Sequence, residues 1–290
     1  MVKLLVNSLL VMLFLTGCAS GPAIDTRYSS ESQDSRVQYV VLHYTSSGFE
    51  RSLGTLTRGP VSSHYLIKQS PPTIYRLVDE SRRAWHAGDS SWQGRTWLNA
   101  TSIGIELVHP GYSETPLGRV WHTWEPRQIQ ALTELLADIL ERHNLTPDRV
   151  VGHSDVAPQR KLDPGPLFPW QQLADAGVAI WPDQQQVQSH LNELRDRTPP
   201  LRWFRQSLAT FGYALPEDID TDRGSPALRN VIAAFQMRFR PARYDGLPDS
   251  ETAALLAALV PAAVSWPDWC APADAPREAD PCQAPPAALE

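Results

Sequence analysis

The sequence predicts an α/β protein with a mixed central β-sheet flanked by helices, followed by a small C-terminal three-helix domain. Three observations lead to this prediction: several apolar runs of the kind found in buried strands, one long amphipathic stretch among them, and three further helical stretches towards the C-terminus. A chain of 290 residues is long enough for two modest domains.

The apolar runs predict strands at 37–44 (VQYVVLHY), 102–109 (SIGIELVH) and 149–153 (RVVGH). Residues 63–69 and 73–80 alternate in polarity around Ser-Pro-Pro, which predicts a hairpin. Residues 126–143 repeat apolar side chains at three- and four-residue spacing, which predicts a helix with Thr123 as its N-cap. Strands that alternate with helices indicate an α/β domain over residues 36–182.

The C-terminal part of the sequence is organised differently. Residues 183–199 are polar and predict a linker, partly helical, and residues 200–262 predict three helices. Ser225-Pro226 and Asp249-Ser250 are start signals for the second and third helix. The expected core of this small bundle consists of its large apolar side chains: Phe204, Leu208, Phe211, Leu228, Phe235, Phe239, Leu255 and Leu259.

The N-terminus indicates export. Residues 1–17 have the short apolar core of a signal peptide, and residues 18–35 are small and polar, which predicts a flexible tether. Leu15-Thr16-Gly17-Cys18 resembles a bacterial lipobox, which implies a lipid on Cys18; a soluble secreted protein with an incidental Cys18 is the alternative. Because Ala19 follows the cysteine, the resemblance to enterobacterial lipoproteins implies the periplasmic face of the outer membrane of a Gram-negative bacterium.

Composition restricts the partners. The chain has 26 Lys and Arg residues against 32 Asp and Glu residues and no basic run interleaved with aromatic side chains, which argues against nucleic acid. Nothing in the sequence implies a protein partner. In the Pro-rich tail (263–290), Cys270 and Cys282 predict one disulfide in an oxidising compartment, with two free thiols as the alternative.

Two histidines stand at the ends of predicted strands, and a carboxylate follows the second. His43 and His153 each close an apolar run, and Asp163 comes ten positions after His153. Two neutral imidazoles and one carboxylate are a ligand set that zinc accepts in hydrolases, where a water in the fourth position titrates near pH ~7. Asp155 is a rival ligand on spacing alone. The sequence contains no H-E-x-x-H, G-x-S-x-G or Walker motif.

Five segments then match one family in the right order: VVLHYTSS, SSHYLI, AWHAG, LNATSIGIEL and VVGHSDVAPQRKLDPGPLFPW. Together they resemble the zinc-dependent N-acetylmuramoyl-L-alanine amidases of the AmpD/AmiD type, which share a fold with the peptidoglycan recognition proteins. The resemblance covers essentially the whole first domain, and the lipobox associates it with the AmiD lipoprotein branch. The stretch from Ala234 to Leu259 resembles a three-helix peptidoglycan-binding module. The alternative is a helical appendage that binds nothing.

The family resemblance implies one zinc ion per chain, held by His43, His153 and Asp163, and leaves Asp155 a structural role. It also implies a catalytic pair, Glu106 and Lys161. Glu106 would move a proton from water to the leaving amine, and Lys161 would donate to the developing oxyanion.

The implied reaction is hydrolysis of the amide between N-acetylmuramic acid, or its anhydro form, and L-alanine of the stem peptide, in peptidoglycan and its fragments, for cell-wall turnover or recycling. Two alternatives stay open: a non-catalytic peptidoglycan receptor on the same fold, and a zinc peptidase that cuts within the stem peptide. His64, Trp85, His86 and Asn99 are candidates for substrate contact, with packing and scaffold hydrogen bonding as the alternative.

Overall fold

The computed structural model describes residues 22, 24–195, 197–217 and 225–260, and the chain divides into two compact units, Met1–Asp34 and Ser35–Glu290. In the first unit, residue 22 and residues 24–34 form no helix or strand. The expected signal peptide, Cys18 and the tail with Cys270 and Cys282 lie outside the described residues. No helix within the described ranges is long and apolar enough to cross a membrane.

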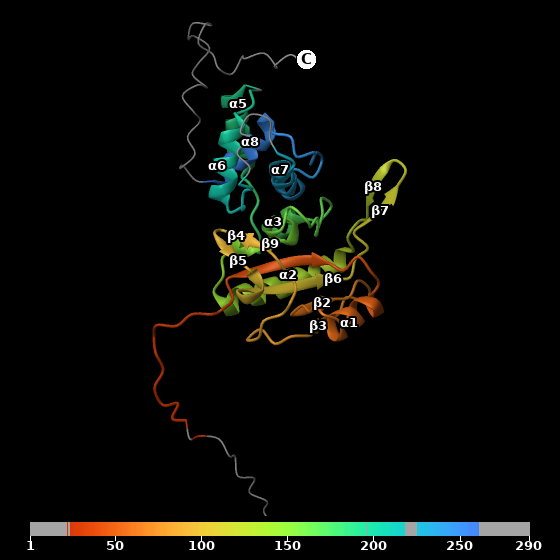
Figure 1. Cartoon of the computed structure of the whole chain (residues 1–290), viewed down its shortest axis with the longest axis vertical. Coiled ribbons are helices and arrows are strands. Elements are labelled where there is room, and N and C mark those ends of the chain that lie inside the picture. The colour runs from red at the N-terminus through yellow and green to blue at the C-terminus, as the bar shows by residue number, and fades with distance from the viewer. Residues whose placement is uncertain (1–21, 23, 196, 218–224, 261–290) are drawn as a thin grey trace, which may run out of the picture. The chain divides into compact units, whose positions relative to one another are not determined.

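In the described part of the second unit, five strands form one mixed sheet in the order β3-β2-β6-β1-β9 (Figure 1). β2, β6, β1 and β9 are parallel to one another, and β3 pairs antiparallel with β2. Two short hairpins, β4–β5 and β7–β8, lie outside this sheet. The strand bounds are β1 Tyr39–Tyr44, β2 Tyr65–Ile67, β3 Ile74–Arg76, β4 Ser91–Trp92, β5 Arg95–Thr96, β6 Ser102–Leu107, β7 Tyr112–Thr115, β8 Gly118–Trp121 and β9 Val150–Gly152.

Helices connect and follow these strands. The α-helices are α1 Phe49–Arg58, α2 Pro126–His143, α3 His153–Val156, α4 Trp170–Asp175, α5 Gln184–Leu194, α6 Leu201–Phe211, α7 Pro226–Phe239 and α8 Ser250–Leu259. Two 3₁₀ helices, η1 Leu98–Ala100 and η2 Pro147–Arg149, precede β6 and β9. The predicted mixed sheet, the predicted hairpin (β2 and β3) and the three predicted C-terminal helices are therefore confirmed.

The strand predicted at 149–153 is two residues too long, because Arg149 still belongs to the 3₁₀ helix η2, β9 runs from Val150 to Gly152, and His153 begins α3. The Gly152 N–H donates to the carboxylate of Asp155, 2.8 Å away, and this bond turns the chain from strand into helix. His153 therefore occupies the first turn of a short helix at the carboxyl end of a strand.

Helix α2 covers one face of the sheet (Figure 1). Its apolar stripe, which includes Ile129, Leu132 and Leu136, belongs to the same buried cluster as Val40 and Leu42 of β1. The bounds agree with the prediction, but the N-cap does not: Glu125 in extended conformation precedes Pro126 and makes no side-chain cap bond. Pro126 itself lacks an N–H, so the first turn has one donor fewer to satisfy.

The other face of the sheet is covered through the C-terminal helices. Tyr39, Val41 and Val151 belong to one buried cluster with Phe204 of α6 and Phe235 of α7. The short helix α3 lies between, in contact with β1 and β9 on one side and α7 on the other (Figure 1). The core of this region is therefore continuous from the sheet into the C-terminal helices.

The segment predicted as a linker, 183–199, contains helix α5, which packs against α8. Asp183 caps it by accepting a hydrogen bond from the N–H of Gln186. Val187 and Leu194 are buried, and Leu191 is partly buried. Their spacing of four and three residues makes a narrow apolar stripe in an otherwise polar sequence, so α5 is a part of the C-terminal helical domain.

Candidate metal centre and active site

The candidate site lies where the parallel strands of the sheet end. His43 lies near the carboxyl end of β1, and its register partner on β6 is Glu106. His153 follows directly after β9, the neighbour of β1 on its other side. The carboxyl edge of parallel strands is where α/β proteins place their functional groups, because the loops that follow the strands converge there.

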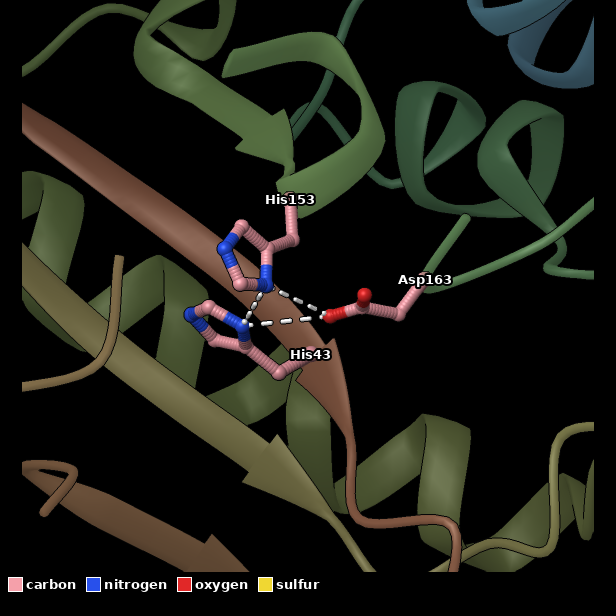
Figure 2. Close-up of side chains that lie close together, drawn as sticks. All are labelled: His43, His153 and Asp163. Atoms are coloured by element: carbon pink, nitrogen blue, oxygen red, sulfur yellow. Dashed lines mark hydrogen bonds and ion pairs between the residues drawn. The ribbon is translucent and has the colours of Figure 1, made fainter. Parts of the chain in front are cut away.

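Three buried side chains converge at this edge (Figure 2). The Nδ1 atoms of His43 and His153 lie 2.9 Å apart, and Oδ2 of Asp163 lies 3.2 Å from the first and 3.0 Å from the second. Within the described ranges, these are the residues whose donor atoms could hold one metal ion. The structure thus brings together the three predicted ligands, which are up to 120 residues apart in sequence.

A chain of hydrogen bonds fixes the tautomer of His43. The hydroxyl of Ser102 donates to the carbonyl oxygen of Leu98, 2.6 Å away, and so accepts from Nε2 of His86 at 3.1 Å. Nδ1 of His86 is then an acceptor, and it takes the Nε2–H of His43 at 3.0 Å. The Nδ1 atom of His43 therefore carries a lone pair that points at the cluster.

The second histidine is oriented in the same way. Nε2–H of His153 donates to the carbonyl oxygen of Ala87 at 3.2 Å, which leaves a lone pair on its Nδ1 atom. Two imidazole lone pairs and a carboxylate oxygen of Asp163 are thus directed at one point, where they could share a cation.

The chemistry of this donor set fits zinc. Ligand atoms at ~2.0–2.1 Å from a tetrahedral zinc ion lie about 3.3 Å apart, close to the separations observed here. The groups that accept hydrogen bonds from the two imidazoles, His86 (itself bonded to Ser102) and the Ala87 carbonyl, are also of the kind that orients histidine ligands at such sites.

The pKa shifts of His43 and Asp163 favour the protonation states that metal ligands need. Burial lowers the pKa of His43 to about 4, the neighbouring His153 acts in the same direction, and Asp163 opposes them only in part. Burial alone would raise the pKa of Asp163, but His153 and His43 outweigh it and hold that pKa below its usual range. At neutral pH His43 is therefore uncharged and Asp163 is ionised, as metal binding requires.

Glu106 lies beside the cluster in a different electrostatic state. Burial raises its pKa to about 8, the charge of Asp163 adds to the effect, and Lys161 opposes it. Its Oε2 atom is buried and has no hydrogen-bond partner among the described residues. A carboxylate with a raised pKa and an unused oxygen next to a metal site is suited to proton transfer.

The cluster opens into a cleft with a volume of about 630 Å³. Glu106 and Lys161 both line it, together with the exposed Arg51 of α1. Arg160 lines it too, but its guanidinium is held by the carbonyl oxygens of Ala87 and Asp89. The predicted catalytic pair thus shares one cleft with the three predicted ligands.

The residues proposed for substrate contact are placed unequally. Trp85 is half exposed and lines the cleft, whereas His86 lines it but is committed to His43. His64 and Asn99 are buried and do not line the cleft. Their polar atoms are used by the scaffold: His64 accepts from the Gly104 N–H, and Asn99 accepts from the N–H groups of His86 and Ala87. For these two residues the geometry favours the scaffold alternative.

Asp155, the rival ligand, points away from the metal cluster. One oxygen accepts from the Tyr213 hydroxyl at 2.6 Å, and the other accepts from Arg238 at 2.8 Å and from Gly152. This geometry supports the structural role expected for Asp155. The partners Tyr213 and Arg238, like Ser102, were missed in the sequence because no local pattern marks them.

Known proteins with similar sequences belong to one enzyme family. The sequence profile of the N-acetylmuramoyl-L-alanine amidase family matches residues 33–166, and that of a peptidoglycan-binding domain family matches residues 197–256. The N-acetylmuramoyl-L-alanine amidase AmiD of Escherichia coli is 44% identical over 263 residues, which cover 86% of this chain and 94% of AmiD.

Two solved structures are similar over most of the chain. The complex of E. coli AmiD with anhydro-N-acetylmuramic acid-L-Ala-D-γ-Glu-L-Lys has a TM-score of 0.76 and 45% identity, covering 81% of this chain and 93% of that chain. AmpDh3 from Pseudomonas aeruginosa, in complex with anhydromuramic pentapeptide, has a TM-score of 0.76 and 40% identity, covering 82% and 97%. The predicted amidase-type fold is confirmed, and this chain belongs to the N-acetylmuramoyl-L-alanine amidase family.

Proposed function

We propose that this chain is a zinc-dependent hydrolase of the amide between N-acetylmuramic acid, or its anhydro form, and L-alanine of the stem peptide. The observation that carries the proposal is the convergence of two imidazole lone pairs and one carboxylate oxygen beside Glu106 in an open cleft. Solved structures of two relatives, E. coli AmiD and P. aeruginosa AmpDh3, hold anhydromuramyl peptides, and the ligand of AmiD contains this bond.

His43, His153 and Asp163 would hold the metal. When bound there, zinc would polarise the scissile carbonyl and lower the pKa of water to about 7. Glu106 would take a proton from the attacking water and deliver it to the leaving amine of L-alanine. Lys161 would donate to the negative charge that develops on the carbonyl oxygen.

The cleft also suits an anionic peptide. Two cationic side chains line it: Arg51 from α1 and Lys161 from the loop after α3. The peptide in the E. coli AmiD complex contains D-γ-Glu, whose free carboxylate such cations would attract. This supports a stem peptide as the part of the substrate that lies in the cleft.

Product analysis tests the proposal against its alternatives. The zinc-loaded protein is incubated with anhydro-N-acetylmuramic acid-L-Ala-D-γ-Glu-L-Lys, and products are identified by mass. We expect free anhydro-N-acetylmuramic acid and an intact tripeptide that begins with L-alanine. A cut inside the peptide would identify a zinc peptidase, and binding without products would identify a receptor; either result contradicts the proposal.

We also propose that a lipid on Cys18 anchors the enzyme at the periplasmic face of the outer membrane. The lipobox-like sequence and the following Ala19 support this proposal. The Cys18→Ala protein should leave the outer-membrane fraction while its activity on soluble fragments stays unchanged. Sedimentation of this variant with outer membranes would contradict the proposal.

Cys270 and Cys282 are proposed to form a disulfide. An intact-mass measurement before and after reduction and alkylation tests this pairing.

The C-terminal helical domain is proposed to bind the cell wall. The match of residues 197–256 to a peptidoglycan-binding domain family supports this proposal. A pull-down with insoluble sacculi measures the contribution of this domain. It compares catalytically inactive protein with the same protein in which exposed polar residues on α6 to α8 are substituted. If none of these substitutions reduces the amount of protein retained on the sacculi, the result favours a helical appendage that packs on the first domain and binds nothing.

A further inference from the structure

A buried ion pair connects the C-terminal helical domain to the segment that carries a metal ligand. Arg238 on α7 donates to the carboxylate of Asp155 on α3 at 2.8 Å, and the two side chains are 2% and 1% exposed. The hydroxyl of Tyr213, just after α6, donates to the other oxygen of the same carboxylate at 2.6 Å. Because buried charges are costly unless they are well paired, such a cluster holds its members in one arrangement.

Arg238 reaches both ends of the segment around His153. Its second amino group donates to the carbonyl oxygen of Val150 at 3.0 Å, at the start of β9. Its guanidinium lies 4.2 Å from the centre of the Trp170 ring, which holds the plane of the guanidinium in place. The side chain thus fixes residue 150 and residue 155, and His153 lies between them.

The same segment also positions the third ligand. The N–H of Ser154 donates to the carbonyl oxygen of Asp163 at 2.8 Å. Gly152 lies so close to Pro164 that a Cβ atom at Gly152 would meet the Pro164 ring at 2.8 Å. A shift of residues 150–155 would therefore move His153 directly and Asp163 through these two contacts.

We propose that Arg238 and Tyr213 are positioning residues for the metal ligands His153 and Asp163. The C-terminal helical domain is then a part of the scaffold of the metal site. The inference rests on the proposed function, because it assumes that the three ligands hold zinc. The five catalytic and ligand positions all lie in the first domain, but deletion of everything after about residue 200 would remove Arg238 and Tyr213 and so disturb the metal site.

Zinc affinity of the metal-free protein tests the inference. The variants Arg238→Gln and Tyr213→Phe are titrated with zinc in competition with a chromophoric chelator, and thermal unfolding is recorded for each. Loss of groups that orient metal ligands typically weakens metal affinity by about 10- to 100-fold. We expect a loss of this order for Arg238→Gln and a smaller loss for Tyr213→Phe, which removes one hydroxyl and keeps the ring.

Arg240 provides the matched control. It lies two residues after Arg238 and pairs with Asp249 at 2.5 Å, inside the C-terminal helical domain. Arg240→Gln should lower the unfolding temperature and leave zinc affinity at the wild-type value. Equal zinc affinity in the wild type, Tyr213→Phe and Arg238→Gln would overturn the inference. If Arg238→Gln does not fold, Tyr213→Phe and Arg238→Lys decide in the same way.

The outcome is distinguishable from a failure of the proposed function. A wild-type protein that does not bind zinc would overturn the metal site itself. A wild-type protein that binds zinc tightly, with variants that bind it equally well, would overturn only the positioning role of Arg238 and Tyr213.

Discussion

His43 and Glu106 are register partners on the adjacent parallel strands β1 and β6, and both line the same cleft. Side chains of register partners on parallel strands point to the same side of the sheet. The sheet itself therefore places the candidate metal ligand His43 next to a carboxylate whose pKa burial raises to about 8.

Glu106→Gln should abolish proton transfer and keep the metal. The amide has nearly the shape of the carboxylate but cannot accept a proton, so turnover should fall by roughly 10²- to 10⁴-fold. Zinc content, measured by plasma mass spectrometry, should stay at one per chain. Turnover near that of the wild type would show that Glu106 is not the general base.

Lys161→Met should shift the pH profile as well as slow the reaction. Burial and Asp163 raise the pKa of Glu106, and Lys161 lowers it. Without that cation the pKa rises further, so the base is protonated up to a higher pH and the acidic limb of the pH-rate profile moves upward. The control is Lys68→Met, since Lys68 does not line the cleft. An acidic limb that stays in place in Lys161→Met contradicts the predicted coupling.

Gly104→Ala should disturb the metal site through His86. A Cβ atom at Gly104 would lie 2.4 Å from Cγ of His86, so the imidazole must move and lose its contact with His43. We expect weaker zinc binding, by about 10- to 100-fold, together with a lower unfolding temperature. Gly48→Ala is the matched control, because a Cβ atom there meets nothing within 4 Å. Wild-type zinc affinity in Gly104→Ala would argue against a role for His86 in orienting His43.

Glu80→Gln should reduce stability in a pH-dependent way. Burial alone would raise the pKa of Glu80, but hydrogen bonds from Arg142, Tyr65 and His143 outweigh it and lower that pKa from 4.5 to about 2. A carboxyl group with a lowered folded-state pKa stabilises the fold fully above pH 4.5 and loses this contribution as the pH falls towards 2.

The substitution should therefore cost about 1–3 kcal/mol of unfolding free energy at pH 7 and much less near pH 2. Urea unfolding at several pH values measures the difference. Glu141→Gln, at an exposed position of the same helix as Arg142, is the control and should show little change at any pH. A pH-independent effect of Glu80→Gln would mean that its ionisation does not contribute.

The parts of the fold that depend on local sequence could be predicted. The strand β1 and the helix α2 follow from β-branched runs and from apolar periodicity, which act over a few residues. The short hairpins β4–β5 and β7–β8 were not predicted, because two- to four-residue strands with mostly exposed side chains carry little pattern. The sequence predicts only a partly helical linker where α5 forms, because the apolar stripe of this helix is narrow.

The family resemblance names the three candidate ligands, which the structure brings together, but it does not indicate the contacts that hold them in place. The contact between Arg238 and Asp155 joins residues 83 positions apart, and the hydrogen bonds that fix the His43 tautomer join β1, η1 and β6 through the loop of His86. No periodicity or spacing in the sequence indicates such pairings, because they arise only when the sheet and the helices are packed together.

Isotope labelling tests the central claim most directly. The zinc-reconstituted protein hydrolyses anhydro-N-acetylmuramic acid-L-Ala-D-γ-Glu-L-Lys in water enriched in oxygen-18, with the metal-free protein in parallel. We predict one labelled oxygen on the lactyl carboxylate of the muramic acid product, no label in the tripeptide, and no turnover without metal. Label inside the peptide, or equal turnover by the metal-free protein, would contradict the assignment of this chain as a zinc-dependent amidase.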